Sequence, residues 1–244
     1  MKQSIFTITE NKRIATDVYS MRLCGDTSAV TAPGQFVNIR LDGLFLRRPI
    51  SVCDCVDGEL WLVYKVVGHG TEQMACMQPG QELDVLTGLG NGYDISSAGD
   101  APLLVGGGVG TPPLLLLAKS LRAQGKKVSA VLGFNTAREI ILKDDLEALG
   151  CGVSIATMDG SAGTKGFVTD ALPAEASYIF ACGPEPMLRA VYRATACPAQ
   201  FSFEERMGCG FGACMGCSCR TVTGYKRICT DGPVLRREEI LWQI

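Results

Sequence analysis

The chain has 244 residues, of which 47% are hydrophobic and 20% are charged. This length is enough for one large domain or two smaller ones with apolar cores, and the composition argues against a disordered chain. The formal net charge is -2 and no block of like charges is present. The charge pattern therefore argues against nucleic acid or an anionic membrane surface as the main partner.

The first nine residues alternate between polar and apolar side chains and lack the apolar run of a signal peptide. We therefore expect the chain to stay in a reducing compartment, the cytoplasm, where its 12 cysteines are ligands or buried thiols instead of disulfides. The long uncharged stretch at 101–118 contains four glycines and three prolines, which would break a membrane-spanning helix. No membrane span is expected.

Residues 1–97 are predicted to form an antiparallel β-barrel. Short runs of alternating polar and apolar residues, such as 35–41 and 59–67, are separated by turn pairs that contain glycine. One helix is expected within this segment, at 71–78, with Thr71 as its N-cap.

Residues 98–204 change to an alternation of strands and helices, which predicts an α/β unit with a doubly wound parallel sheet and helices on both faces. The expected strands are 103–105, 128–133, 153–157, 178–182 and 200–204. The expected helices are 111–124, 139–149 and 185–195.

A glycine-rich loop follows the first strand of this sheet, and four of the five residues at 106–110 are glycine. Glycines let backbone N–H groups approach a pyrophosphate at the positive end of a helix, so the loop predicts a nucleotide site. A plain strand-to-helix turn would need fewer glycines. We expect Thr111 to cap the next helix and Pro112 to lie in its first turn. The candidate binding residues are Gly107, Gly108, Gly110 and Thr111.

The loop differs from the usual dinucleotide fingerprint, because Thr111 replaces the third glycine and no acidic residue ends the second strand. The ribose contact is therefore left unassigned. A second loop, Cys182-Gly183-Pro184, follows the fourth strand at its carboxyl end, where ligands bind in doubly wound sheets. The residue type alone leaves two interpretations of Cys182 open, a functional thiol and a buried inert one.

Residues 205–244 contain an array of four cysteines with C-x4-C-x2-C spacing and one cysteine further on: Cys209, Cys214, Cys217 and Cys229. This spacing is typical of a plant-type [2Fe–2S] cluster. A structural zinc site is the alternative, but such sites usually consist of two short C-x2-C pairs. A Rieske centre needs two histidines, and the chain has one.

Cys219 is a fifth thiol near the array, and Cys217 is preferred as the third ligand because it completes the x2 spacing. The segment has too few apolar residues for a core of its own. We therefore expect the cluster to organise it.

A nicotinamide site and an iron–sulfur cluster in one chain imply a flavin between them, because a hydride carries two electrons and the cluster accepts one. The barrel offers two candidate stretches, Arg48-Pro49-Ile50-Ser51, whose guanidinium can clamp a pyrophosphate, and the glycine loop Gly68-His69-Gly70-Thr71. A surface arginine pair and a simple helix cap are the alternative interpretations. His69 is expected to be exposed and is assigned no role.

Taken together, the three segments resemble the ferredoxin–NADP reductase superfamily, and within it the electron transfer subunits of type 1B dihydroorotate dehydrogenase. The resemblance covers essentially the whole chain. It rests on R-P-I-S at 48–51, the glycine-rich stretch at 88–93, the glycine-rich loop at 106–110, the C-G-P motif at 182–184 and the cysteine array.

The resemblance implies roles for individual residues. It implies that FAD contacts Arg48, Pro49, Ile50, Ser51, Val63, Tyr64, Lys65, Gly70 and Thr71. It implies that Gly183 and Pro184 bind NAD together with the loop at 106–110, with Cys182 beside the reactive nicotinamide ring. The four cysteines of the array are carried over as cluster ligands, and Cys219 as a non-ligand.

The implied mechanism starts at an FMN-containing catalytic subunit, which oxidises dihydroorotate in pyrimidine biosynthesis, and runs through the [2Fe–2S] cluster and FAD to NAD+. Members of the family form a heterotetramer of two catalytic and two electron transfer subunits. The chain itself has no visible dihydroorotate site.

Three alternatives remain. A subunit of a sulfide dehydrogenase or of an NADH-dependent ferredoxin–NADP oxidoreductase resembles the chain along its whole length, but some of those relatives replace one cluster cysteine with aspartate. A self-sufficient NADH:acceptor reductase would work without a partner. A non-enzymatic, zinc-bound interaction module would be colourless, unlike a flavin or an iron–sulfur protein. NAD is favoured over NADP by the resemblance, although Arg138 could meet a 2′-phosphate.

Overall fold

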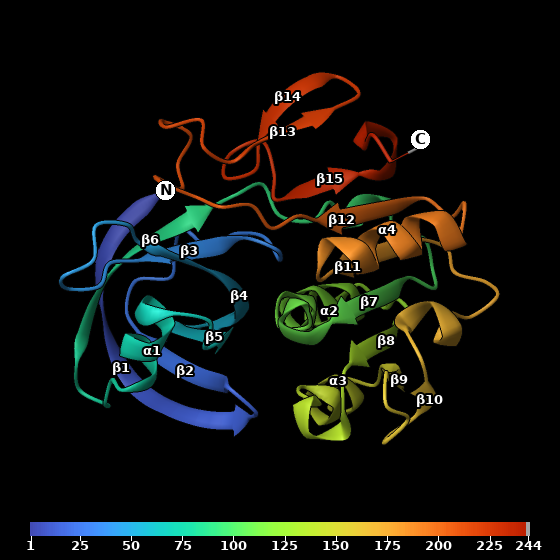
Figure 1. Cartoon of the computed structure of the whole chain (residues 1–244), viewed down its shortest axis with the longest axis horizontal. Coiled ribbons are helices and arrows are strands. Elements are labelled where there is room, and N and C mark those ends of the chain that lie inside the picture. Colours follow the sequence, from blue (N-terminus) through green and yellow to red (C-terminus); the bar gives the residue numbers. More distant parts are fainter. Residues whose placement is uncertain (243–244) are drawn as a thin grey trace.

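Six antiparallel strands of the N-terminal part close into a barrel, drawn in blue and teal in Figure 1. The computed structural model describes residues 1–242. Around the barrel the strand order is β1-β2-β5-β4-β3-β6. The bounds are β1 (Lys2–Ala15), β2 (Val18–Cys24), β3 (Phe36–Ile39), β4 (Arg48–Val56), β5 (Glu59–Lys65) and β6 (Glu82–Leu89). The predicted antiparallel barrel is confirmed.

Apolar side chains that alternate along each strand fill the barrel, for example Val37 and Ile39 of β3. Helix α1 (His69–Ala75) packs on this core through Met74. The prediction of Thr71 as N-cap is wrong, because Gly68 holds that position and the helix begins two residues before the expected start. The Thr71 hydroxyl instead reaches back from the third helical position and accepts the N–H groups of Val67 and Gly68, at 2.9 and 3.2 Å.

A seven-stranded sheet with the order β10-β9-β8-β7-β11-β12-β15 forms the second part. Its strands are β7 (Leu103–Gly107), β8 (Ser129–Phe134), β9 (Gly152–Thr157), β10 (Thr164–Lys165), β11 (Ile179–Cys182), β12 (Ala199–Ser202) and β15 (Val234–Arg236). All neighbouring pairs are parallel except β12 and β15, which run antiparallel. The predicted parallel sheet is confirmed, and the C-terminal segment adds one strand to its edge.

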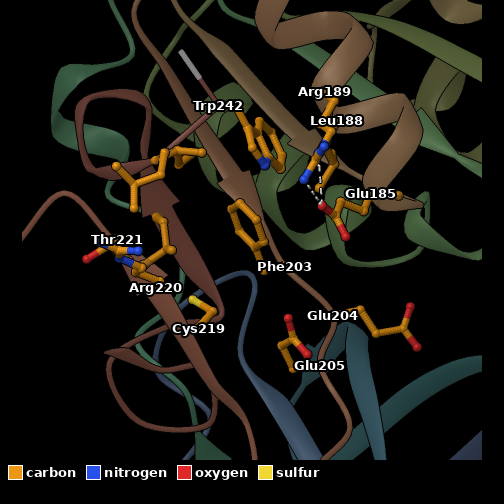
Figure 2. Close-up of a pocket in the computed structure, with 14 residues that line it drawn as sticks. Glu185, Leu188, Arg189, Phe203, Glu204, Glu205, Cys219, Arg220, Thr221 and Trp242 are labelled. Carbon is orange, nitrogen blue, oxygen red and sulfur yellow. Dashed lines mark hydrogen bonds and ion pairs between the residues drawn. The ribbon is translucent and has the colours of Figure 1, made fainter. Parts of the chain in front are cut away.

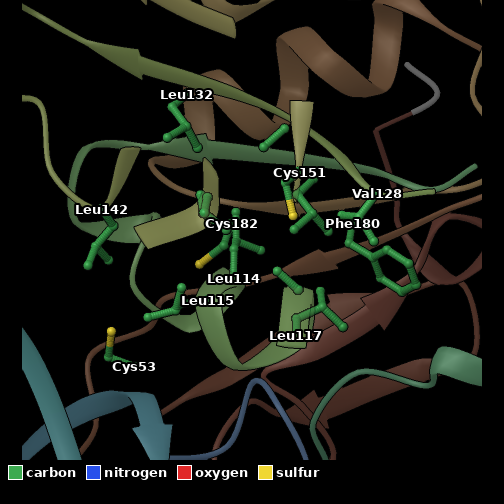
Figure 3. Close-up of a cluster of buried hydrophobic side chains, with 14 of the residues drawn as sticks. Cys53, Leu114, Leu115, Leu117, Val128, Leu132, Leu142, Cys151, Phe180 and Cys182 are labelled. Atoms are coloured by element: carbon green, nitrogen blue, oxygen red, sulfur yellow. The ribbon is translucent and has the colours of Figure 1, made fainter. Parts of the chain in front are cut away.

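Helices cover both faces of the sheet, as predicted. Helices α2 (Pro113–Ala123) and α3 (Lys143–Ala148) pack on one face, and α4 (Glu185–Ala194) packs on the other. Figure 3 shows the core beneath α2, where Leu117 lies toward Phe180 of β11 and Leu114 lies beside Cys182. The short 3-10 helices are η1 (Ile95–Ser97), η2 (Gly108–Gly110), η3 (Ala137–Glu139), η4 (Val168–Ala171) and η5 (Arg237–Glu239).

Two further helix starts differ from the prediction. The helix expected at 139–149 begins at Lys143, because Leu142 has a left-handed φ of 59° that interrupts the helical backbone. Thr111 does not cap α2, because it ends the 3-10 turn of the glycine loop and Pro112 precedes the helix. The predicted strand at 200–204 likewise ends at Ser202.

Helix α2 lies between the sheet and the barrel (Figure 1). Cys53 and Val63 on the outer wall of the barrel share a buried cluster with Leu115 of α2. Beside them, Lys119 of α2 forms an ion pair with Asp54 of β4. Apolar packing and one ion pair therefore join the first two parts of the chain.

The C-terminal segment, red in Figure 1, has a hairpin formed by β13 (Ser218–Thr221) and β14 (Gly224–Arg227). Its apolar side chains join the core under the sheet, where the Trp242 ring lies 5.9 Å from Phe201 and 5.7 Å from Tyr192. The expectation that this segment has no core of its own agrees with this packing. The last two residues of the predicted segment 205–244 lie outside the described residues. Within residues 1–242, no helix is long and apolar enough to cross a membrane.

Candidate redox centre and nucleotide-binding loops

The loop that carries the first three array cysteines folds around its own sulfur atoms. Cys209 Sγ accepts hydrogen bonds from the backbone N–H groups of Phe211, Ala213 and Cys214, at 3.2–3.5 Å. Gly210 and Gly212 make this possible, because their φ angles of 78° and 89° turn successive N–H groups toward the sulfur. Such donors stabilise a thiolate and tune the potential of a bound cluster.

The four array thiols form two neighbouring pairs. The N–H of Cys209 donates to Cys214 Sγ, and the N–H of Cys229 donates to Cys217 Sγ, each at 3.4 Å. Cys214 is exposed, whereas Cys217 and Cys229 are buried. Within the described residues no three Cys, His, Asp or Glu side chains gather around a single ion. In a [2Fe–2S] cluster held by four cysteines, each iron is bound by two thiolates, so two pairs of thiols fit such a cluster.

The pKa values of Cys209 and Cys229 shift in opposite directions. Burial opposes ionisation of Cys209, but the N–H groups of Phe211 and Cys214 lower the pKa of its thiol to about 6. Burial, together with the adjacent Cys217 thiol, raises the pKa of Cys229 to about 12. Cys229, in the inner pair, therefore needs a positive partner before its thiol can ionise at neutral pH, and iron would supply that charge.

The β13–β14 hairpin holds the cysteine loop in place. Arg227 at the end of β14 donates from Nη1 to the carbonyl of Gly212 at 3.0 Å. Its Nε and backbone N–H both donate to Asp231 Oδ2, at 3.2 and 2.8 Å. One arginine thus connects the loop of the first three cysteines to the turn that carries Cys229.

Two asparagines attach the C-terminal segment to the rest of the chain. Asn38 of β3 donates from Nδ2 to the carbonyl of Cys209 at 3.1 Å. Asn91 donates to the carbonyl of Val234 at 2.9 Å and accepts the N–H of the same residue at 3.2 Å. Sequence reasoning did not single out Asn38, because a lone polar residue in a strand carries no local signal. Asn91 lies in the glycine-rich stretch that carried part of the resemblance.

The two candidate flavin stretches meet on the barrel. The Arg48 side chain crosses Gly70, where an added Cβ would collide with its guanidinium. Arg48, Pro49, Ile50 and Ser51 are half-buried along the first half of β4. The Thr71 hydroxyl accepts the N–H of Val67 and donates to the carbonyl of Gly68. These bonds use its hydrogen-bonding groups within the loop itself, so what remains for a ligand is mainly the backbone of Thr71 at the start of α1. The structure therefore brings together the R-P-I-S motif and the loop at 68–71. Binding of one ligand by both segments requires this proximity.

The predicted flavin residues of β5 face different surroundings. Val63 is buried against α2, whereas Tyr64 points into the barrel, with its ring 5.9 Å from Tyr19. The Tyr64 hydroxyl donates to Asn11 Oδ1 at 3.1 Å, and burial raises its pKa. Lys65, at the end of the strand, is half-buried. Of these three side chains, the structure leaves Lys65 the most accessible.

The two predicted nucleotide loops lie against each other. An added Cβ at Gly110 would collide with the carbonyl of Cys182, and one at Gly107 would collide with Met187 Sδ. Gly108 has open space above it and a φ of 52°. The glycines therefore let this loop close on Cys182-Gly183-Pro184. Thr111 Oγ1 is buried without a hydrogen-bond partner in the described part of the chain, so a polar atom is left for a bound phosphate.

Cys182 is held as a neutral thiol. Burial raises its pKa to about 12, against the opposing effect of hydrogen bonding to Ser202 and Tyr93. The Tyr93 hydroxyl also donates to the carbonyl of Ala181 at 3.1 Å. At neutral pH the Cys182 side chain can therefore pack and donate a hydrogen bond, but it is not a nucleophile.

A groove of about 410 Å³ separates the C-terminal segment from α4 (Figure 2). Gly183 lies at one wall, and Cys219 of β13 lies at the other. Arg189 pairs with Glu185 at 2.8 Å and stands 5.6 Å from the Trp242 ring. Cys219 thus belongs to the wall of this groove.

Comparison with known proteins agrees with this geometry. Residues 204–241 match the family described as the iron–sulfur cluster binding domain of dihydroorotate dehydrogenase B. The dihydroorotate dehydrogenase B (NAD(+)) electron transfer subunit of Fusobacterium nucleatum is 43% identical over 98% of this chain and 99% of its own length. The chain belongs to this family of electron transfer subunits. The member from Bacillus caldolyticus is also 43% identical, over 96% of this chain and 97% of its own.

A solved structure supports the same assignment. A chain of the NADH-dependent reduced ferredoxin–NADP oxidoreductase, studied for flavin-based electron bifurcation, superposes with a TM-score of 0.88. It is 33% identical and covers 97% of this chain and 90% of its own. The chain is thus an oxidoreductase subunit of the kind that the sequence predicted, and the oxidoreductase that formed the first alternative is structurally close.

Proposed function

We propose that the chain carries electrons from a catalytic partner subunit to NAD+, with a [2Fe–2S] cluster on Cys209, Cys214, Cys217 and Cys229 as the entry point. One observation carries the proposal. The cysteine loop exposes Cys214 to solvent and, through the Cys209 carbonyl, contacts strand β3 of the barrel. One short loop is therefore open to a partner on one side and contacts the barrel with the candidate flavin site on the other.

The barrel is proposed to hold FAD. Arg48 supplies a positive charge for the pyrophosphate, and Gly70 leaves the room that the Arg48 side chain occupies. The proposed contacts are Arg48, Pro49, Ile50, Ser51, Val63, Tyr64, Lys65, Gly70 and Thr71. Because the Val63 and Tyr64 side chains are buried, we assign them a role through their backbone. When bound, FAD would take single electrons from the cluster and deliver two as a hydride.

The sheet is proposed to hold NAD at the carboxyl ends of β7 and β11, where ligands bind in doubly wound folds. Backbone N–H groups of the loop at 106–110 are available to the phosphates, and the buried Thr111 hydroxyl, which has no partner within residues 1–242, directly follows that loop. The proposed contacts are Gly107, Gly108, Gly110, Thr111, Gly183 and Pro184. The neutral thiol of Cys182 is proposed to line the nicotinamide end, where a carboxylate or thiolate would disfavour an approaching hydride.

The same proposal divides the chain into three units, 1–97 for FAD, 98–204 for NAD and 205–244 for the cluster. The strands of the barrel, the parallel sheet and the hairpin fall within these limits, while β15 crosses back to complete the sheet of the second unit. An electron transfer subunit works with a catalytic subunit. We propose that this partner contains FMN, oxidises dihydroorotate in the cytoplasm, and assembles with the chain as two plus two subunits.

The test is dihydroorotate-dependent reduction of NAD+ by the complex that co-purifies with the tagged chain from its native host. Activity in the complex, with none in the isolated chain, is the expected result. If the complex reduces a dye with NADH but does not oxidise dihydroorotate, the partner assignment is wrong and the cofactor assignment stands. A colourless protein without iron would overturn both.

A second candidate function follows from the solved structure with a TM-score of 0.88. A subunit of an NADH-dependent reduced ferredoxin–NADP oxidoreductase would use the same three sites with another partner. NADPH-dependent reduction of ferredoxin by the co-purified complex, without dihydroorotate oxidation, would select this second candidate.

A further inference from the structure

Asn38 is a buried polar side chain on a barrel strand, and none of the assigned sites uses it. Its exposed fraction is 0%. Nδ2 donates to the carbonyl of Cys209 at 3.1 Å, and Oδ1 has no hydrogen-bond partner within the part of the chain that the structure describes. Gly210 leaves room for the amide, because an added Cβ there would collide with Nδ2.

The register of the barrel places Asn38 beside the candidate flavin motif. Val37 and Ile39 point into the barrel core, so the side chain of Asn38 between them lies on the outer wall. In the β3–β4 pair, Asn38 is directly opposite Pro49, and Ile39 is opposite Arg48. Paired residues share a face of a sheet. The first cluster ligand is therefore separated from the R-P-I-S motif by one side chain.

Stability alone does not account for an amide at this position. An acceptor buried without a partner costs free energy, and an apolar side chain of similar size would fill the space without that cost. What the amide adds is its N–H donor, which holds the peptide that follows Cys209, the proposed first ligand. The Arg47 guanidinium also donates to the backbone carbonyl of Asn38, at 3.3 Å, and fixes the strand behind it.

We propose that Asn38 is a positioning residue for electron transfer between the cluster and the flavin. Its Nδ2 fixes the peptide of the ligand Cys209 at a set distance from β4 and contributes one dipole to the surroundings of the cluster. This inference rests on the proposed function, because it requires a cluster on the cysteine loop and a flavin on β4.

The test uses the full chain with its cofactors and two substitutions. Asn38→Leu keeps the approximate size and removes the donor. Asn38→Asp keeps the shape and replaces the amide donor with a carboxyl group. Thr87→Val is the matched control, because Thr87 is also 0% exposed and its hydroxyl donates to the carbonyl of Lys2 at 3.3 Å on a different barrel strand.

Each protein is reduced with NADH under anaerobic conditions while flavin absorbance and the electron paramagnetic resonance spectrum of the cluster are followed. For Asn38→Leu we expect unchanged iron, FAD and flavin reduction, but cluster reduction slower by about tenfold, because one hydrogen bond of ordinary strength no longer orders the ligand peptide. The g-values of the cluster in this variant should also shift. For Asn38→Asp the cluster potential should shift, because the dipole beside the Cys209 peptide changes. Thr87→Val should match the wild type.

Wild-type cluster spectra, potentials and transfer rates in both Asn38 variants would overturn the inference, even if amide hydrogen exchange at 210–213 became faster. That last result would show a purely structural contact. A wild-type protein whose cluster is not reduced through its flavin by NADH would instead contradict the proposed function. The two failures are therefore distinguishable.

Discussion

Cys214 is the exposed member of the outer thiol pair, and its sulfur accepts the N–H groups of Cys209 and Gly216, at 3.4 and 3.5 Å. We expect Cys214→Ser to lose the cluster, because a serine hydroxyl is a poor substitute for a thiolate on iron. The visible cluster absorbance and the iron content should fall to near zero. Reduction of FAD by NADH should survive, because the residues proposed to bind FAD and NAD lie on the barrel and the nucleotide loops and not on the cysteine loop.

Cys219→Ser is the matched control for this substitution, because Cys219 lies on β13 in the wall of the groove. Its iron content should equal that of the wild type. Full dihydroorotate-dependent NAD+ reduction by a complex that contains Cys214→Ser would contradict a relay through the cluster.

Arg48 is the one cationic side chain of the R-P-I-S motif, and it lies across Gly70. Arg48→Ala should weaken FAD retention by roughly tenfold to a hundredfold, because a charge-assisted hydrogen bond contributes about 1.5–3 kcal/mol. Gly70→Ala should act in the same direction, since a Cβ there displaces the guanidinium. FAD content after extended dialysis is the measurement. Arg40→Ala, which removes a largely exposed arginine of the same barrel, is the control, and equal flavin loss in all three variants would remove Arg48 from the site.

At the scale of elements, local periodicity was sufficient for the fold. The alternation along β3 and β5 predicted the barrel, and the strand–helix rhythm after residue 98 predicted the parallel sheet. Helix starts were less accurate, because they depend on single backbone angles and on longer-range hydrogen bonds. The left-handed φ of Leu142 and the backward reach of the Thr71 hydroxyl have no signature in the surrounding residue types. Strand β15 was missed because its partner β12 lies more than 30 residues away.

Helix α2 and strand β4 are joined by an ion pair between Lys119 and Asp54, whose side chains are 36% and 9% exposed. Lys119→Met should destabilise the fold by about 2 kcal/mol, because it leaves a largely buried carboxylate without its partner while solvent still reaches part of the site. The expected fall in Tm is roughly 5 °C by calorimetry.

The double variant Asp54→Asn, Lys119→Met should recover most of this loss, because the amide oxygen can still accept the Cys55 N–H that Asp54 Oδ1 now accepts at 2.9 Å. The single variant Asp54→Asn completes the comparison. If the loss of stability in the double variant equals the sum of the losses in Lys119→Met and Asp54→Asn, the pair does not couple the barrel to the helix.

At the scale of the whole molecule, the contacts that decide function join distant parts of the chain. The bond between Asn38 and Cys209 spans 171 residues, and the Asn91 contacts to the C-terminal segment span more than 140. The spacing of the cysteines predicted the cluster ligands, but no local pattern shows that their loop rests on the barrel. That arrangement depends on how three folded parts pack, which only the structure displays.

Two exposed apolar side chains lie near Cys214 in the sequence. Phe211 is 45% exposed and Met215 is 55% exposed, on either side of Cys214 in the sequence. An electron transfer subunit must bring its cluster close to the catalytic subunit, so we expect these side chains to be covered in the complex. Phe211→Glu should weaken binding of the catalytic subunit by at least about tenfold, because it places a charge in an apolar contact. Iron content and NADH-to-dye activity of the isolated chain should be unchanged.

Val56→Glu is the control, because Val56 is 52% exposed and ends β4, about 25 Å along the strand from Arg48. Isothermal titration of each variant with the catalytic subunit measures the effect. If Phe211→Glu binds as tightly as Val56→Glu and the wild type, the catalytic subunit docks on another face. In that case the cluster would have to receive electrons across the inner thiol pair, Cys217 and Cys229, and substitutions beside those buried residues would become the next test.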